Sequence, residues 1–228
     1  QAQTSKSVAV TAIVDHPALD AVRKGVEDEL KAQGWQAGKN LKYQYQSAQG
    51  NAATAGQIVR KFIGDKADAI VAIATPSAQA AAAATSSVPI VFSAVTDPVA
   101  AKLVKDLKAP GGNVTGVSDR LPLAPQVDLM LKVVPTAKRV GIVYSPGEIN
   151  PTILIKELKA VLAQRGMTLV SAAAPRTVDV QAATKSLVGK VDLIYSSTDN
   201  NVVSAYETMV RVATDAKLPM IAADTSSI

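Results

Sequence analysis

Polar side chains suited to holding a small ligand follow nearly every strand-like run in the sequence. Each of these positions brings a hydroxyl, a carboxylate, an amide, an aromatic ring or a proline-started helix. In open α/β sheets, ligands bind beyond the carboxyl ends of the strands, where the amino-termini of helices point. The candidate ligand-binding residues are therefore Asp15, His16, Pro17, Thr75, Pro76, Ser77, Asp97, Ser118, Tyr144, Glu148, Asn150, Asp199, Asn200 and Asp224.

The run Thr75-Pro76-Ser77 has the most definite chemistry of these. Thr at the N-cap and Pro at the first helical position are typical of a helix start. The free N–H groups and the dipole of such a start attract anions, so a ligand carboxylate is the expected guest. Helix capping without any ligand explains the same residues equally well.

Five acidic residues can bind an ammonium group through charge-assisted hydrogen bonds: Asp15, Asp97, Glu148, Asp199 and Asp224. One or two would suffice, and carboxylates that crowd together cannot all stay ionised. For Asp97 and Asp199, a role as a cap or turn former is an equal alternative.

Two further acids, Asp68 and Asp192, stand at strand starts, on the far edge of each expected sheet. We expect them to be structural.

The sequence offers little for catalysis. His16 is the only histidine, there is no cysteine, and no G-x-S-x-G motif supplies a nucleophile. Metal-ligand spacings, the P-loop and the dinucleotide-binding pattern are also absent from the sequence. We therefore expect His16 to line a pocket or to cap a helix, and we expect no enzyme activity and no cofactor.

Charge and hydropathy exclude two further classes. The formal net charge is +5, but Lys and Arg are scattered singly or in pairs and are not interleaved with aromatics, so nucleic acid is not an expected partner. No apolar run reaches the roughly 18 to 20 residues of a membrane span. The polar start without an initiator Met is expected of a processed chain, from which a signal peptide has been removed.

Short β-branched runs alternate with helical patterns, which indicates an α/β fold with parallel sheets. The expected strands lie near 7–14, 41–46, 69–74, 89–95, 114–118, 139–144, 167–173, 191–196 and 218–223. The expected helices lie near 17–33, 51–64, 76–86, 122–133, 151–165, 179–188 and 201–216, with a short one after Pro98.

The order of these elements repeats. Lys66-Ala67-Asp68-Ala69-Ile70 is echoed by Lys190-Val191-Asp192-Leu193-Ile194, and each half has a Pro-led strand. The turn Pro110-Gly111-Gly112-Asn113 precedes a strand that we take as a crossing between lobes. The expected domains are 1–118 and 119–228, with a ligand cleft between the two lobes. Because nothing returns to the first lobe after the last strand, we expect the second lobe to be incomplete at its carboxy-terminus.

Several runs resemble one substrate-binding family of ABC transporters, that of tryptophan/tyrosine or aromatic amino-acid uptake. The likeness covers essentially the whole chain and is carried by residues 11–20, 73–79, 89–98, 110–119, 144–150 and 197–200. It implies a type I periplasmic-binding-protein fold with two Rossmann-like lobes. It also implies export from the cytoplasm, delivery of the ligand to a membrane permease, and a free amino acid, with Trp, Tyr or Phe favoured, as that ligand.

The sequence-based hypothesis is thus a non-enzymatic, monomeric, periplasmic or otherwise extracytoplasmic receptor for an α-amino acid. The carboxylate would lie at Thr75-Pro76-Ser77, helped by Asn150 or Asn200, and Asp199, Asp224 or Asp97 would take the ammonium. Two alternatives stay open: the ligand-sensing core of a LacI-type transcription regulator, and an enzyme such as a racemase or lyase working in the cleft.

Overall fold

A computed structural model describes residues 4–223 of the 228-residue chain. The chain divides between Arg120 and Leu121 into two compact units, which we call unit 1 and unit 2. The boundary expected from the sequence lay two residues earlier, after residue 118. No helix in the described part of the chain is both long enough and apolar enough to cross a membrane.

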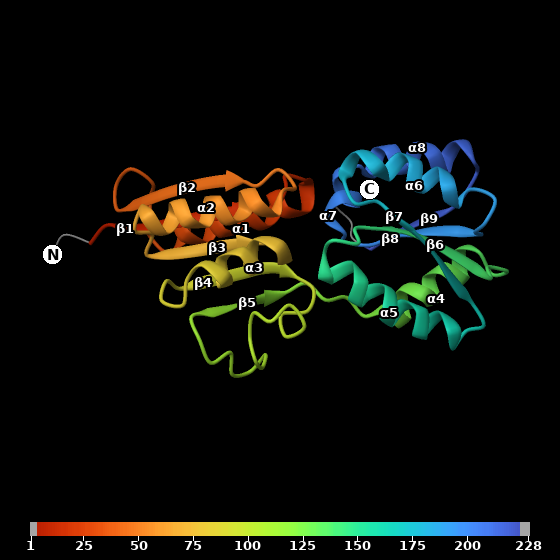
Figure 1. The fold of residues 1–228 in the computed structure, drawn as a ribbon, viewed down its shortest axis with the longest axis horizontal. Helices are drawn as coiled ribbons and strands as arrows, with labels where there is room; N and C mark the ends of the chain where they lie inside the picture. Colours follow the sequence, from red (N-terminus) through yellow and green to blue (C-terminus); the bar gives the residue numbers. More distant parts are fainter. Residues whose placement is uncertain (1–3, 224–228) are drawn as a thin grey trace. The chain divides into compact units, whose positions relative to one another are not determined.

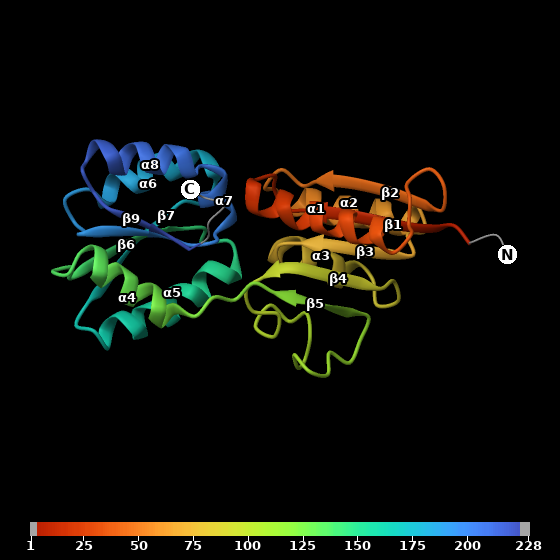
Figure 2. The same cartoon turned by 180° about the vertical axis from the view of Figure 1, so that it is seen from behind.

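Unit 1 is a parallel five-stranded sheet with the strand order β2-β1-β3-β4-β5 (Figure 1). Helix α1 lies on one face of this sheet, and α2 and α3 lie on the other, as Figures 1 and 2 show from opposite sides. The elements are β1 (Lys6–Ala12), α1 (Pro17–Ala32), β2 (Leu41–Ser47), α2 (Ala52–Gly64), β3 (Ala69–Ile73), α3 (Thr75–Ala84), β4 (Ile90–Val95) and β5 (Val114–Ser118).

The core of unit 1 forms because its central strands are apolar on both sides. Ile70 and Ile73 of β3 and Phe62 of α2 are almost completely buried. A parallel strand covered by helices on both faces reads as a continuous apolar run, and β3 does so. The carboxyl ends of the parallel strands are held together at one edge of the sheet, where the loops to α1 and α3 begin.

Unit 2 repeats this plan with a parallel four-stranded sheet in the order β7-β6-β8-β9. Leu158 of α5 and Met130 of α4 pack on one face, and Leu187 of α6 and Met209 of α8 pack on the other. Its elements are α4 (Leu123–Val133), β6 (Arg139–Tyr144), α5 (Ile149–Ala163), β7 (Thr168–Ala173), the 3₁₀-helix η1 (Thr177–Asp179), α6 (Val180–Leu187), β8 (Leu193–Ser196), α7 (Asn200–Ser204), α8 (Tyr206–Asp215) and β9 (Met220–Ala222).

The two strand-start aspartates have the structural role that we expected. Asp68 Oδ2 accepts the backbone N–H of Ser7 at 2.7 Å, which fixes the start of β1. Asp192 Oδ2 accepts the N–H groups of Lys138 and Arg139 at 2.8 Å each, which fixes the start of β6. These backbone donors hold the pKa of Asp192 below its usual value.

The helix expected after Pro98 is wrong, because residues 98–102 form turns only. Asp97 holds this segment: its Oδ1 accepts the N–H of Ala100 at 3.0 Å and its carbonyl accepts that of Ala101 at 2.9 Å. Lys102 then takes a left-handed conformation, with φ of 60°, which ends the turn.

The single helix expected over 201–216 is also wrong, since α7 and α8 are separated at Ala205 (φ −112°, ψ 23°). Ser204 Oγ donates to the carbonyl of Asn200 at 2.8 Å. A hydroxyl bonded to the carbonyl four residues earlier competes with the helical backbone and favours a bend there.

Candidate functional site

Helix α3 starts on a strained residue. Ala74 follows β3 directly and has φ of 79° and ψ of 157°, a conformation normally restricted to glycine. Its N–H is fixed by the carbonyl of Ser93 at 2.9 Å. Ala74 is therefore the N-cap, and the expectation that Thr75 fills that position is wrong: Thr75 is the first helical residue and Pro76 the second. Only Ala74 lies between the last residue of β3 and the first residue of α3, so no other residue can take up the strained conformation.

Thr75 and Ser77 bring unused hydrogen-bonding groups to the start of α3. Their side chains are 1% and 0% exposed, and neither hydroxyl oxygen has a hydrogen-bond partner among the described residues. The first turn of a helix also leaves its N–H groups without intrahelical acceptors. Buried polar atoms without partners are rare and costly, so this cluster of donors is a candidate anion subsite.

The Asp15-His16-Pro17 run forms the start of α1. His16 is buried and is the N-cap, and its Nδ1 accepts the N–H of Leu19 at 3.4 Å. Asp15 is exposed, and its Oδ1 accepts the Tyr45 hydroxyl at 2.6 Å. The Arg23 guanidinium lies 4.0 Å from the centre of the Tyr45 ring. These contacts hold the loop after β1.

Asp97 and Ser118 serve the backbone at the ends of β4 and β5. Besides its turn contacts, Asp97 pairs through Oδ2 with Arg120 Nη1 at 3.3 Å. Ser118 Oγ donates to the carbonyl of Thr96 at 3.0 Å and accepts the N–H of Arg120 at 3.2 Å. Both residues hold the chain where unit 1 ends.

In unit 2, Asp199 is 1% exposed and fully engaged. As the N-cap of α7, its Oδ1 accepts the N–H groups of Asn201 at 3.0 Å and Val202 at 3.3 Å. Ser145 donates to the same carboxylate through its N–H and its hydroxyl, at 2.6 and 2.7 Å. Burial raises the pKa of Asp199, and these donors oppose that rise.

Glu148 has a different environment. It is the N-cap of α5, but its side chain caps nothing. Its Oε2 accepts Asn200 Nδ2 at 3.0 Å, and Asn150 also donates to the carboxylate. Burial, with the nearby charge of Asp199, raises the pKa of Glu148 to about 7. Asn150 is 7% exposed, and its Oδ1 has no partner within the described residues. The donors named for Glu148 are thus neutral amides, and the Oδ1 of Asn150 beside it is an acceptor without a donor among the described residues.

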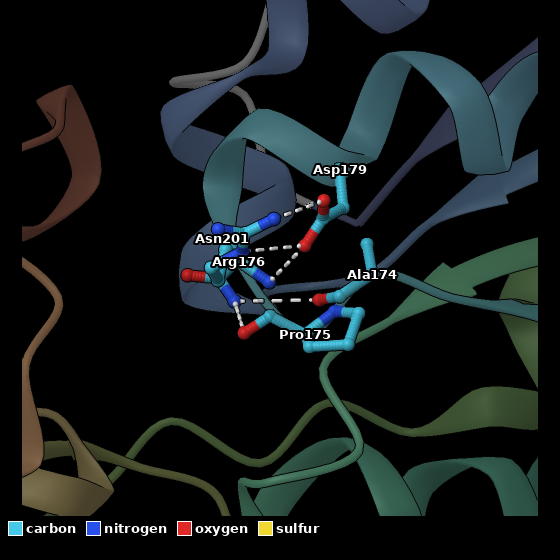
Figure 3. Close-up of polar contacts among 5 residues, drawn as sticks. All are labelled: Ala174, Pro175, Arg176, Asp179 and Asn201. Atoms are coloured by element: carbon cyan, nitrogen blue, oxygen red, sulfur yellow. Dashed lines mark hydrogen bonds and ion pairs between the residues drawn. The ribbon is translucent and has the colours of Figure 1, made fainter.

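Asn201, which is not among the candidates predicted from the sequence, fixes α7 to the loop after β7. Its Nδ2 donates to the carbonyls of Ala174 and Pro175 at 3.4 and 3.2 Å, as Figure 3 shows. The same loop is closed by the pair of Arg176 and Asp179, whose Nη2–Oδ1 distance is 3.0 Å. The only sequence signal was its place beside Asn200, which is also an amide.

Tyr144 and Asp224 are the remaining candidates. Tyr144 ends β6 and is partly buried. Asp224 lies outside the described residues. Within residues 4–223, no group of three or more His, Asp or Glu side chains is placed to hold a metal ion.

The structure therefore brings the candidates together in two separate groups, one in each unit. Thr75, Pro76 and Ser77 form a donor cluster at the start of α3. Glu148, Asn150, Asp199 and Asn200 form an acidic cluster at the starts of α5 and α7. Asp97, Ser118 and the Asp15–Pro17 loop lie at the same strand edge of unit 1 but contact other groups.

Comparison with known proteins supports one class. The family model described as ABC transporter substrate binding protein matches residues 7–228. A tyrosine-binding protein of Clostridioides difficile strain R20291 is 40% identical over 223 residues, which cover 98% of this chain. The match spans 65% of that relative's own length.

Two solved structures are similar. A conserved domain protein from Vibrio cholerae O1 biovar El Tor is 50% identical, with a TM-score of 0.96 over 98% of this chain and 76% of that one. A domain from Streptococcus pneumoniae in complex with L-Trp is 34% identical, with a TM-score of 0.94 over 99% and 76% of the two chains. The α/β fold with two parallel sheets, of type I periplasmic-binding-protein architecture, is thereby confirmed.

Proposed function

The chain belongs to the ABC transporter substrate binding protein family, and from this premise we propose that it is a receptor for a free amino acid with an aromatic side chain. The family indicates a binding protein rather than an enzyme. Under this proposal Thr75 and Ser77 bind the ligand carboxylate, and the acidic cluster of unit 2 binds its ammonium group.

The unused buried hydroxyls of Thr75 and Ser77 are the observation that carries the proposal. A carboxylate accepts hydrogen bonds from hydroxyls and from free helix N–H groups, and the helix dipole favours its negative charge. The acidic cluster offers the complement, because an ammonium group carries three donors and no acceptor. The carboxylate of an amino acid is thus matched to the hydroxyls of Thr75 and Ser77, and its ammonium group to the Oδ1 of Asn150, which have no partner among the described residues.

The aromatic side chain is proposed from the relatives. The Streptococcus pneumoniae structure holds L-Trp, and the Clostridioides difficile relative is called a tyrosine-binding protein. In the present chain Tyr144, at the end of β6, and the Asp15–Pro17 loop are the candidates to contact the ring.

We further propose that the receptor works outside the cytoplasm as a monomer and delivers the ligand to the membrane permease of an ABC importer. Family membership supports the extracytoplasmic setting and the permease as partner. A test is transport of the labelled amino acid into vesicles that hold the permease, with and without the receptor.

Binding is tested by isothermal titration calorimetry of the refolded chain against L-tyrosine, L-tryptophan and L-phenylalanine. Refolding removes carried-over ligand. We expect one-to-one binding of at least one of the three and none of tyramine, which lacks the carboxylate. Equal binding of tyramine would contradict the role of Thr75 and Ser77, and silence across the panel would reject the aromatic amino acid as ligand.

A further inference from the structure

The surroundings of Glu148 favour the protonated form of its carboxyl group. Its carboxylate is partly buried at the start of α5, and its described hydrogen-bond donors are the neutral amides of Asn150 and Asn200. The charged group that acts on it is Asp199, which is also an acid. A carboxylate beside another carboxylate and without a cation favours its protonated form.

Asp199 cannot take the ligand as readily. Its two oxygens accept four hydrogen bonds, two from Ser145 and two from the N–H groups of Asn201 and Val202. A ligand ammonium would have to displace donors that hold α7 in place. Glu148 has no such structural duty, because its side chain caps no N–H of α5.

Asn150 gives a second, independent sign that a donor binds here. Its amide nitrogen donates to Glu148, so the atom left without a partner is the oxygen, an acceptor. The residue is 7% exposed, and a buried acceptor without a donor is costly. A primary ammonium supplies donors to the Glu148 carboxylate and to this oxygen at once.

We propose that Glu148, and not Asp199, receives the ammonium group of the ligand, and that Glu148 loses a proton to solvent as the ligand binds. This inference rests on the proposed amino-acid ligand. The O–H bond of the neutral Glu148 carboxyl breaks, the proton leaves to water, and the ammonium keeps its three protons and meets a carboxylate. Binding is then linked to pH, and mild acid releases the ligand.

The direction of the pH effect follows from linkage. Burial first, and then the charge of Asp199, raise the pKa of Glu148 to about 7 without ligand, and an adjacent ammonium would lower it. The bound state therefore holds fewer protons, so affinity rises with pH through the neutral range. Between about pH 6 and about pH 8 the ionised fraction of such a group grows about tenfold, and the affinity should grow by the same factor.

Calorimetric titration with L-tyrosine and L-tryptophan tests this. Near pH 7, titrations in phosphate and in Tris, which differ in ionisation enthalpy, should show about half a proton released per ligand bound. The Glu148→Gln variant should release no proton and lose the pH dependence, whereas Glu207→Gln, an exposed acid on α8, should behave as the unaltered protein. Binding without proton release, or release that persists in Glu148→Gln, overturns the inference and leaves the proposed function standing.

A ligand pair sharpens the test without any mutation. 3-(4-Hydroxyphenyl)propionate is tyrosine without its amine, and as a carboxylate alone it should bind at least tenfold more weakly near pH 8. Its affinity should fall as the pH rises, opposite to tyrosine, because ionised Glu148 repels it. An analogue that binds as tightly as tyrosine near pH 8 contradicts the inference. If neither tyrosine nor tryptophan binds at any pH, the inference falls together with the proposed function.

Discussion

Ser145 donates two hydrogen bonds to Asp199, one from its backbone N–H to Oδ2 at 2.6 Å and one from its hydroxyl to Oδ1 at 2.7 Å. The bonds join the loop after β6 to the cap of α7, across 54 residues of sequence. Asp199 is thus a brace inside unit 2, and this matches the capping alternative that its sequence context left open.

The hydrogen bonds of Asp199 predict how the free energy of unfolding changes when one donor or the acceptor is removed. Ser145→Ala removes one donor from a buried carboxylate and should lower the free energy of unfolding by about 1–3 kcal/mol. Asp199→Ala removes the acceptor for four donors and should cost more. Urea denaturation followed by circular dichroism measures both. Ser86→Ala, at an exposed position in unit 1, is the control and should change little.

The conformation of Ala74 makes an opposite prediction. Ala74→Gly should stabilise the protein by about 1 kcal/mol, because φ of 79° with ψ of 157° strains any residue with a Cβ. Ala82→Gly, inside the same helix, should instead destabilise by about 1 kcal/mol. The difference in melting temperature between the two variants is the measurement. If Ala74→Gly destabilised the protein as much as Ala82→Gly, the strain at Ala74 would be refuted.

The unused hydroxyls of α3 predict a separation of binding from stability. Thr75→Val and Ser77→Ala remove atoms that have no partner, so stability should stay within about 0.5 kcal/mol or rise. Affinity for the amino acid should fall at least tenfold in calorimetry.

Thr184→Val is the matched control for these two variants. Thr184 is also fully buried, but its hydroxyl donates to the carbonyl of Val180 at 2.7 Å. It should lose about 1 kcal/mol of stability and keep full affinity. A loss of stability in Thr75→Val equal to that of Thr184→Val would show that the Thr75 hydroxyl has a structural role.

Glu148 predicts how stability without ligand depends on pH. Its pKa in the folded protein, about 7, lies above the ordinary value of 4.5, so the folded state holds more protons between these values. Its contribution to stability is therefore greatest in mild acid and is lost as the pH rises towards 7. Glu148→Gln should be more stable than the unaltered protein by about 1–2 kcal/mol near pH 8 and should lose this advantage near pH 5. Melting curves at both values decide, and a constant difference would argue against a raised pKa.

Much of the fold follows from local sequence patterns. Apolar runs such as the one ending at Ile73, and starts such as Pro17, determine strands and helices through short-range preferences. The carboxyl ends of parallel strands then share one edge, so the neighbourhood of the candidate residues follows from topology alone.

The features that the sequence did not predict depend on individual backbone conformations and individual hydrogen bonds. The cap of α3 moved from Thr75 to Ala74 because no side-chain rule predicts alanine in a conformation normally restricted to glycine. The break between α7 and α8 arises at Ser204, whose side chain can either face solvent or bond to the backbone. Asn201 reaches Ala174 across 27 residues, a distance over which local patterns carry no information.

The aspartates at the starts of β3 and β8 have an implication for the history of the chain. Asp68 fixes the start of β1, and Asp192 fixes the start of β6, so the same side chain holds the neighbouring strand in each unit. The runs 66–70 and 190–194 that carry these aspartates also share a Lys two residues before the Asp and an Ile two residues after it. A matching contact at corresponding positions of the two halves is what duplication of a single ancestral segment would leave behind.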